Sequence, residues 1–270
     1  ISNDFFTSMA RSIEDVLNQH GYSLIVCSTD DNKEREANYL QLLREKLVDG
    51  YIINTSGKND ELISKLSQTS PFVLFSRKIT TPTFKGDFID NNNYESMYNL
   101  TKHLLSKGHR KIGLINGQSF LSTSQERQAG FVAAMKDEGI LVDDNYPFFY
   151  HGHFSRISSG AHGIEKLLSA EEKPTAVICA NNLLVTGALQ YCMERNISIP
   201  DEISLCSFGS ISNSSLLKVS PTCVRQLSTS MSLRIADMIM ERIDAKNELV
   251  NREVRFETTL IEGNSVKCIL

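Results

Sequence analysis

The chain alternates short apolar runs with longer segments in which apolar residues recur every three or four positions. A short run rich in β-branched residues predicts a buried strand, and the longer spacing predicts a helix with one apolar face. The predicted helices cover residues 5–20, 34–48, 60–68, 94–107, 126–138, 160–168, 183–195 and 230–243. The predicted strands cover residues 22–27, 50–53, 72–75, 111–116, 147–150, 176–179, 203–207, 222–225 and 252–258, with one more that ends at Ile89 or Asp90.

This alternation of strands and helices predicts an α/β fold with parallel sheets covered on both faces. A single sheet with that many strands would be large, so we expect two doubly wound sheets in separate subdomains. The polar run at residues 90–93 is the expected first crossing between them.

The segment 174–190 shows how the chain arranges polar groups at a strand end. An apolar strand at 176–179 is followed by Asn181 and Asn182 and then by a helical pattern. Asn is a favourable helix N-cap, because its side-chain oxygen accepts a hydrogen bond from a free backbone N–H group. Ligands of open α/β sheets bind at the carboxyl ends of strands. The two amides are therefore candidate ligand contacts.

Composition describes a globular protein, with 41% hydrophobic and 22% charged residues and no apolar run long enough to span a bilayer. The formal net charge of −4 makes these residues poorly suited to grip a phosphate backbone. None of the six cysteines forms a C-x-x-C pair, which favours reduced thiols, a cytoplasmic location and no metal site. The chain begins without Met, so we expect it to be truncated at its start.

Sequence motifs of catalysis and of cofactor binding are missing. There is no Walker loop, no G-x-G-x-x-G after a strand, no H-E-x-x-H and no nucleophile elbow. We therefore expect neither an enzyme nor a bound cofactor. What remains is a set of aromatic and polar side chains at predicted strand ends, suited to a polyhydroxylated or planar small molecule. The alternative is that the Phe residues are core, the Asn residues are caps, and Arg127 pairs with a carboxylate.

Several phrases in the chain resemble the regulatory core of LacI/GalR-type bacterial transcriptional regulators. They are ISNDFF, SLIVCSTDDNKEREANYLQLL, VDGYII, LLSKGHRKIGLING, ERQAGF, PTAVICANN, IPDEIS and TCVRQ, in the family's order and along essentially the whole chain. The resemblance implies a fold similar to type I periplasmic binding proteins, with two subdomains joined by three crossovers and an effector in the cleft. We expect residues 1–91 plus 212–246 in the first subdomain and 92–211 plus 247–270 in the second.

The resemblance also implies the partners. A helix-turn-helix headpiece, a hinge and the first core strand are expected before residue 1, and operator DNA would be bound through that headpiece. The family acts as dimers whose two-fold symmetry mirrors a palindromic operator. The effector changes the angle between the subdomains and thereby the affinity for DNA.

Effector-contacting positions of the family transfer to this chain one by one, and the remaining candidates follow from their places at strand ends. The resulting candidate set is Phe5, Phe6, Asn92, Thr123, Arg127, Phe154, Asn181, Asn182 and Gln226. Arg127 matches an Arg that commonly binds effector hydroxyls or carboxylates, and we expect Arg127→Ala to keep the fold while weakening effector binding by roughly 1.5–3 kcal/mol.

The chain departs from the family where carboxylates normally clasp sugar hydroxyls. The usual Asn-Asp pair is Asn181-Asn182, and the usual Phe-Asp-Asp is FGS at 208–210. The usual Asp of the first crossing is Asn92, unless Asp90 takes its place, and a late Arg is Gly263. A neutral sugar is therefore less favoured, and an anionic or amide-bearing effector is more plausible.

Three functions fit these observations to different degrees. The favoured one is the effector-binding and dimerisation domain of a LacI-type regulator. A solute-binding protein of a sugar transporter is the alternative, and it would carry a signal peptide upstream. An enzyme on a flavodoxin-like scaffold would need a catalytic constellation that the sequence does not contain.

Overall fold

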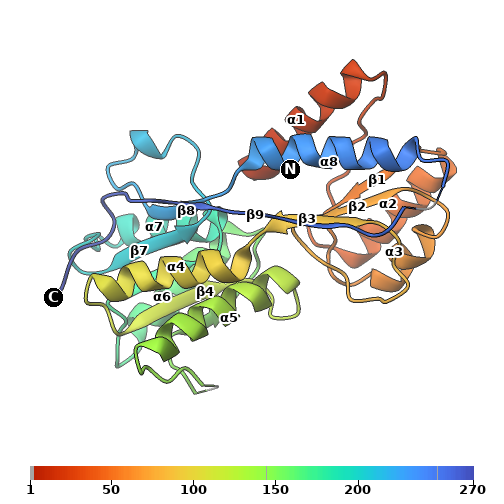
Figure 1. Cartoon of the computed structure of the whole chain (residues 1–270). Coiled ribbons are helices and arrows are strands. Elements are labelled where there is room, and N and C mark those ends of the chain that lie inside the picture. The colour runs from red at the N-terminus through yellow and green to blue at the C-terminus, as the bar shows by residue number, and fades with distance from the viewer. Residues whose placement is uncertain (1–2, 144, 248) are drawn as a thin grey trace. The chain divides into compact units, whose positions relative to one another are not determined.

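The computed structural model describes residues 3–143, 145–247 and 249–270. The chain divides into two compact units, Ile1–Asn91 with Leu227–Phe256 and Asn92–Gln226 with Glu257–Leu270 (Figure 1). Each unit is built on a sheet of mainly parallel strands, which confirms the expected fold class. The chain passes from one unit to the other three times, after Asn91, Gln226 and Phe256.

The first unit contains a four-stranded parallel sheet in the order β1-β2-β3-β9. Two apolar clusters lie on its two faces. One joins β2 and β3 to helices α1 and α8, and the other joins the sheet to α2 and α3. The elements are β1 (Tyr51–Ile53), β2 (Phe72–Phe75), β3 (Asp87–Asn91), β9 (Glu253–Phe256), α1 (Asp4–Gln19), α2 (Lys33–Glu45), α3 (Asp60–Leu66) and α8 (Ser228–Ile243).

The second unit contains a six-stranded sheet in the order β10-β8-β7-β6-β4-β5, in which only the β10–β8 pair is antiparallel. Helices α4 and α5 pack together, and so do α6 and α7. The elements are β4 (Ile112–Asn116), β5 (Phe149–His151), β6 (Ala176–Cys179), β7 (Ser204–Phe208), β8 (Thr222–Arg225), β10 (Thr259–Ile261), α4 (Asn93–Ser106), α5 (Ser122–Asp137), α6 (Ile157–Ser169), α7 (Asn182–Glu194) and the 3-10 turn η1 (Ser214–Leu216).

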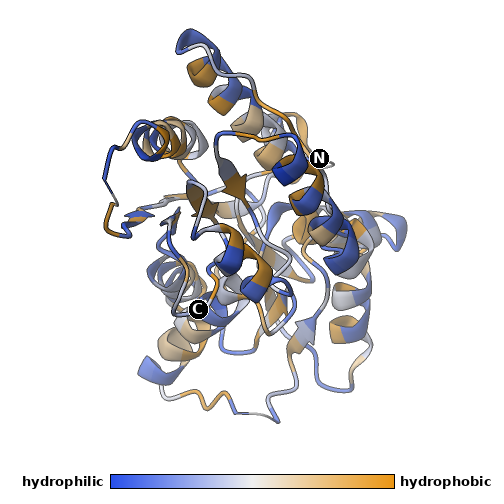
Figure 2. Ribbon diagram, turned by 90° about the vertical axis from the view of Figure 1, so that its right-hand side faces the viewer, coloured by the Kyte–Doolittle hydropathy of each residue, from blue (hydrophilic) through white to orange (hydrophobic). Residues whose placement is uncertain are grey.

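The α6–α7 pair depends on two glycines that let the helix backbones approach. A Cβ at Gly160 would lie 1.9 Å from the Leu184 carbonyl oxygen, and one at Gly187 would lie 1.9 Å from that of Ile157. Any side chain at either position would therefore force the helices apart. Figure 2 shows the apolar strands inside and the helices with one apolar and one polar side.

Asparagine side chains cap four of the described helices, as expected for good N-caps. The Oδ1 atoms of Asn3, Asn32, Asn92 and Asn181 accept hydrogen bonds from the backbone N–H groups of Phe5, Arg35, Glu95 and Leu184. The expected N-cap at the start of the 183–195 helix is Asn181, and its extended backbone, with φ −158°, is typical of that position. Two of the caps, Asn92 and Asn181, are also candidate effector contacts, so their amides serve a structural role as well.

The expected subdomain boundaries are wrong at the second and third crossings. Strand β8 pairs with β7, so residues 212–226 belong to the second unit and not to the first. Strand β9 pairs with β3, so residues 247–256 belong to the first unit. Strand pairing brings distant segments together, and a pattern local to one strand does not specify its neighbours. The strand expected at 252–258 is the shorter β9, and the strand β10 that follows it, in the other sheet, was not expected.

The strand expected at residues 22–27 is absent, because this segment has no regular structure. Ile25 and Val26 are 59% and 52% exposed, and no described strand pairs with the segment. An apolar run forms a strand only where a neighbour takes up its backbone hydrogen bonds. The helices expected from residues 126 and 160 begin earlier, at Ser122 and Ile157, because polar first turns hid their starts.

Within the described residues, no helix is long and apolar enough to cross a membrane.

Candidate functional site

The second unit presents a switch in strand order beside β4. The chain moves from β4 to its neighbour β5 through α5, and then returns past β4 to β6 through α6. Loops diverge from the carboxyl ends of strands at such a point and leave a crevice, where ligands of open α/β sheets bind. Here β4 ends at Asn116 and β6 at Cys179, and the polar residues after these strands form the candidate site.

Arg127 bridges the carboxyl ends of several strands of this sheet. Its Nε donates to Asn93 Oδ1 at 2.9 Å, and its Nη1 donates to the Ala180 carbonyl oxygen at 2.5 Å. The guanidinium carbon lies 3.7 Å from the ring centroid of Phe208 and 5.5 Å from that of Phe154. Arg127 is only 5% exposed. The cation is therefore held by carbonyl, amide and aromatic groups within the unit, an environment that favours the planar Arg fork.

Asn93 continues this polar arrangement towards a carboxylate. Its side chain is fully buried, accepts from Arg127, and donates through Nδ2 to Glu126 Oε2 at 3.0 Å. The Asn93 amide thus links the Arg127 guanidinium to the Glu126 carboxylate. Asn93 was not among the predicted contacts, although it lies in the polar run DNNN at residues 90–93, which marked this segment.

Phe154 and Asn181 fix each other at the ends of β5 and β6. The Phe154 ring packs over Gly117, where an added Cβ would lie 2.3 Å from ring carbons. Asn181 Nδ2 donates to the Phe154 carbonyl oxygen at 2.8 Å while its Oδ1 caps α7. The half-buried Asn182 follows as the first residue of α7.

Gly209 and Gln226 lie together beyond β7 and β8. Gly209 adopts a φ of +90°, and a Cβ at this position would lie 3.1 Å from Gln226 Oε1 and 3.9 Å from the Asn182 backbone nitrogen. A side chain there would be strained and crowded. Gly209 therefore leaves the Gln226 amide and the Asn182 backbone N–H, rather than a carboxylate, at this edge.

The loop after β4 adds polar groups that the sequence analysis did not single out. Gln118 Nε2 lies 2.9 Å from His153 Nδ1, whereas Gln118 Oε1 and Ser124 Oγ are buried without a partner in the described part of the chain. The predicted Thr123 is 2% exposed in the first turn of α5, one helical turn before Arg127. The polar run 118–125 was the available signal.

In the first unit, the predicted Phe5 and Phe6 lie in the first turn of α1. Their rings meet edge to face at 5.2 Å, and Phe6 meets Phe75, the last residue of β2, at 6.0 Å. Asn91, at the end of β3, is 1% exposed, and neither polar atom of its side chain has a partner among the described residues. It was not among the predicted contacts, although it also belongs to the DNNN run.

The predicted residues therefore form two groups. Phe5 and Phe6 lie in the first unit, and the other seven lie in the second, where Asn92 is the first residue and the rest follow strand ends. Arg127, Phe154 and Asn181 are in mutual contact through Phe154, and Asn182 and Gln226 both lie beside Gly209. The competing reading is also partly correct, because Phe154 is in the core and Asn92 and Asn181 are caps.

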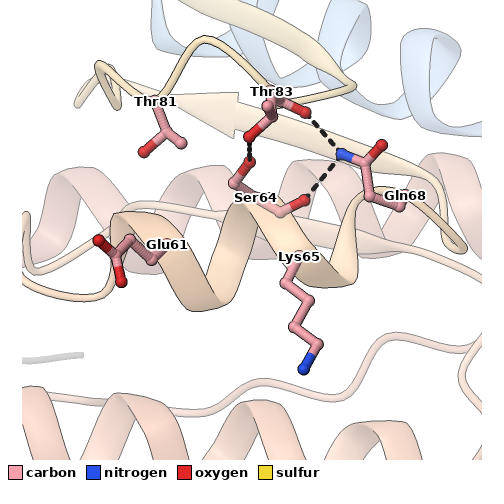
Figure 3. Close-up of a pocket in the computed structure, with 6 residues that line it drawn as sticks. All are labelled: Glu61, Ser64, Lys65, Gln68, Thr81 and Thr83. Atoms are coloured by element: carbon pink, nitrogen blue, oxygen red, sulfur yellow. Dashed lines mark hydrogen bonds between the residues drawn. The ribbon is translucent and has the colours of Figure 1, made fainter.

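The thiols and the surface pocket take no part in this arrangement. Burial raises the pKa of Cys192 to about 11 and also raises the pKa of Cys179 and Cys206, so these groups remain protonated thiols. The described residues contain no group of metal-ligating side chains. A surface pocket between α3 and the following loop is lined by Glu61, Ser64, Lys65, Gln68, Thr81 and Thr83 (Figure 3). It contains no aromatic residue and no predicted contact.

Comparisons with known proteins agree along the whole chain. A family model described as periplasmic binding proteins and sugar binding domain of LacI family matches residues 2–263. The HTH-type transcriptional repressor PurR of Aliivibrio salmonicida is 30% identical over 91% of this chain and 73% of its own length. PurR of Haemophilus influenzae is 30% identical over 98% of this chain and 79% of its own length. A LacI family transcriptional regulator from Enterococcus faecium with bound ribose is 25% identical, covers 100% of this chain and 97% of its own, and superposes with a TM-score of 0.86.

Proposed function

This chain belongs to the family of periplasmic binding proteins and LacI-type sugar-binding domains, and from that premise we propose how it works as a regulator. It is the effector-binding domain of a bacterial transcriptional regulator. The relatives named above are repressors, which disfavours the alternative of a transporter's solute-binding protein. It acts by binding rather than by catalysis, in the cytoplasm, where operator DNA is located.

The effector is a small molecule bound at the carboxyl ends of the parallel strands. The supporting observation is the arrangement around Arg127, where a buried guanidinium, two aromatic rings and several amides meet at a switch in strand order. The proposed contacts are Phe5, Phe6, Asn92, Thr123, Arg127, Phe154, Asn181, Asn182 and Gln226. Arg127 also donates to Asn93 and to the Ala180 carbonyl oxygen, so its guanidinium helps to hold the Phe154 and Phe208 rings in place.

Effector binding changes operator affinity through movement of the subdomains, a coupling between two binding sites. Operator contact falls to a helix-turn-helix headpiece outside these 270 residues, since their net charge is −4. The regulator is a homodimer with α1 near its seam. Sedimentation of the chain at tens of micromolar tests this, and a clean monomer would contradict it.

Isothermal titration calorimetry tests effector binding directly. We expect one site per chain for a member of a panel of sugars and planar heterocycles, and at least a tenfold loss of affinity in Phe154→Ala and in Gln226→Ala. Lys65→Ala, in the surface pocket of Figure 3, is the control and should bind as the unchanged chain does. Equal losses in all three variants, or no loss in the first two, would contradict the proposed site.

A further inference from the structure

Asn91 combines complete burial with an unsatisfied side chain. It ends β3 and is 1% exposed, and its Oδ1 and Nδ2 atoms both lack a hydrogen-bond partner within the described residues. Its main chain is engaged, because the backbone N–H donates to Asp90 Oδ1 at 2.7 Å and the carbonyl oxygen accepts from Arg255 Nη1 at 3.3 Å. The amide side chain is therefore the part of the residue that the fold leaves unsatisfied.

The strand register shows what surrounds this amide. Side chains alternate between the faces of a strand, so Asn91 points to the same face as Ile89. In the parallel register Ile89 pairs with Phe75 and Asn91 pairs with Phe256, and all three apolar partners belong to one cluster with α1 and α8. Phe6 contacts Phe75 at 6.0 Å. At the carboxyl edge of the first sheet, Asn91 thus lies near the aromatic residues Phe6, Phe75 and Phe256.

Asn116 provides a matched comparison from the second unit. It also ends a central strand, β4, and it is fully buried. Its Nδ2 donates to the Ser124 carbonyl oxygen at 3.0 Å, and its Oδ1 accepts from the Gly117 N–H at 2.9 Å. Burial of an unpaired amide opposes folding, whereas a paired one is tolerated. An Asn with both side-chain atoms unpaired at this position therefore calls for an explanation.

We propose that Asn91 recognises the effector, and that the effector is a neutral planar ring carrying a hydrogen-bond donor beside an acceptor, as in a lactam or carboxamide edge. An Asn side chain pairs with such an edge through both of its atoms, as it does with adenine in DNA. The neighbouring Phe rings offer apolar contact to a planar molecule. This inference rests on the proposed effector-binding function and narrows the class of ligand.

Charge near Asn91 supports a neutral partner. Asp90, on the opposite face of β3, lies 3.8 Å from Arg255, and Arg255 also donates to Glu253 at 2.9 Å. The adjacent charges are thus paired with one another. A ligand that relies on free carboxylates for its hydroxyl groups is therefore disfavoured at this edge.

The first arm of the test measures the stability of the ligand-free chain. Asn91→Leu replaces an unpaired amide with an apolar group of similar size, and we expect Tm to rise by about 2–4 °C. The matched Asn116→Leu removes two hydrogen bonds and should lower Tm. A comparable fall of Tm in Asn91→Leu would show that the amide is satisfied structurally, for example by a buried water, and would overturn the inference.

The second arm measures binding by calorimetry to uracil, guanine and nicotinamide, and to ribose, fructose and glucose. We expect one of the planar amides to bind at least tenfold more tightly than any of the sugars, and Asn91→Leu to lose at least tenfold in affinity. Sugar binding that is unchanged in Asn91→Leu would overturn this inference and leave the proposed function standing. If no compound of either class bound, both the inference and the proposed function would be contradicted.

Discussion

The central strands of the two units begin differently. Strand β3 begins with Asp87, a carboxylate with no exposed surface, which accepts hydrogen bonds from Arg242 Nη2 at 2.6 Å and from Arg252 Nη2 at 2.6 Å. Strand β4 begins with the fully buried Ile112, within one continuous apolar cluster that reaches across the second unit. In the first unit the apolar residues instead form two separate clusters.

The difference shows that one topology can be stabilised in two ways. The first unit is assembled from two separate stretches of chain, and the Asp87 network joins β3, from the first stretch, to α8 and the segment before β9, from the second. A buried ion pair contributes little net stability but is costly to break, because the remaining charge loses its partner. The second unit depends on apolar packing, which is not sensitive to a single charge.

Asp87→Asn should have the largest effect and should fall on the first unit. The substitution leaves the buried Arg242 side chain without its countercharge and leaves Arg252 paired only with Glu241. We expect the free energy of unfolding of this unit to fall by about 3–5 kcal/mol. Hydrogen exchange of β3 amides should accelerate while that of β4 amides stays unchanged.

Glu138→Gln serves as the control, because its ion pair with Lys102 is solvent-accessible and screened, so that its loss should change the stability little. Equal acceleration of exchange in β3 and β4 after Asp87→Asn would refute the idea that the two units are stabilised separately.

Arg127→Ala should produce the next largest effect, in the second unit. The substitution leaves the buried Asn93 Oδ1 and Ala180 carbonyl oxygen without their donor and removes the cation beside Phe208. We now expect a loss of about 2–3 kcal/mol in stability, in contrast to the intact fold expected from the sequence alone. Denaturation followed by near-UV circular dichroism measures it, with the exposed Arg195→Ala as control. If Arg127→Ala were as stable as the unchanged chain, Arg127 would not stabilise the fold, and its role would be limited to binding the effector.

These cases show which parts of the molecule the sequence determines locally. The alternation of elements and the Asn caps were predictable, because helix periodicity and capping depend on residues a few positions apart. Three features were not predictable: the sheet membership of β8 and β9, the failure of residues 22–27 to form a strand, and the burial of Arg127. Each depends on neighbours far away in the chain. The same is true of Asn91, whose unsatisfied amide is visible only once its surroundings are known.

Lowering the pH should destabilise the second unit before the first, because of His109. The ring is fully buried, with Nδ1 2.9 Å from Thr175 Oγ1 and Nε2 3.1 Å from the Lys267 carbonyl oxygen. Burial lowers the pKa of His109, and the nearby positive Lys267 and His103 lower it further, although the Lys267 carbonyl opposes this. A lowered pKa means that the unfolded chain binds the proton more readily. The stability of the second unit should therefore fall as pH decreases below about 6.5, by at most about 1.4 kcal/mol per pH unit for one proton.

The first unit should respond in a lower pH range. Burial alone would raise the pKa of Asp87, but the hydrogen bonds from Arg242 and Arg252 outweigh it and hold this pKa below its usual value. The stability that this carboxylate contributes is thus present above about pH 4 and is lost only as pH falls further. Hydrogen exchange between pH 7 and pH 5 should therefore accelerate in β4 before β3. The opposite order would contradict the assignment of these groups.

Asn181→Ala should have the smallest effect on stability. It compares one helix N-cap of the second unit with one of the first. The Asn181 amide accepts from Leu184 N–H and donates to the Phe154 carbonyl oxygen, so the substitution removes a cap and a contact to the candidate site. Asn32→Ala is the matched control in the first unit, where the side chain caps α2 through Arg35 N–H and lies at an exposed position. Loss of a cap alone costs about 1 kcal/mol, so Asn32→Ala should lose about that much and Asn181→Ala somewhat more. Effector binding separates the two variants further. Only Asn181→Ala should weaken it, because this substitution frees the Phe154 backbone. If both variants lost the same stability and both bound the effector normally, the role of Asn181 would be limited to capping α7.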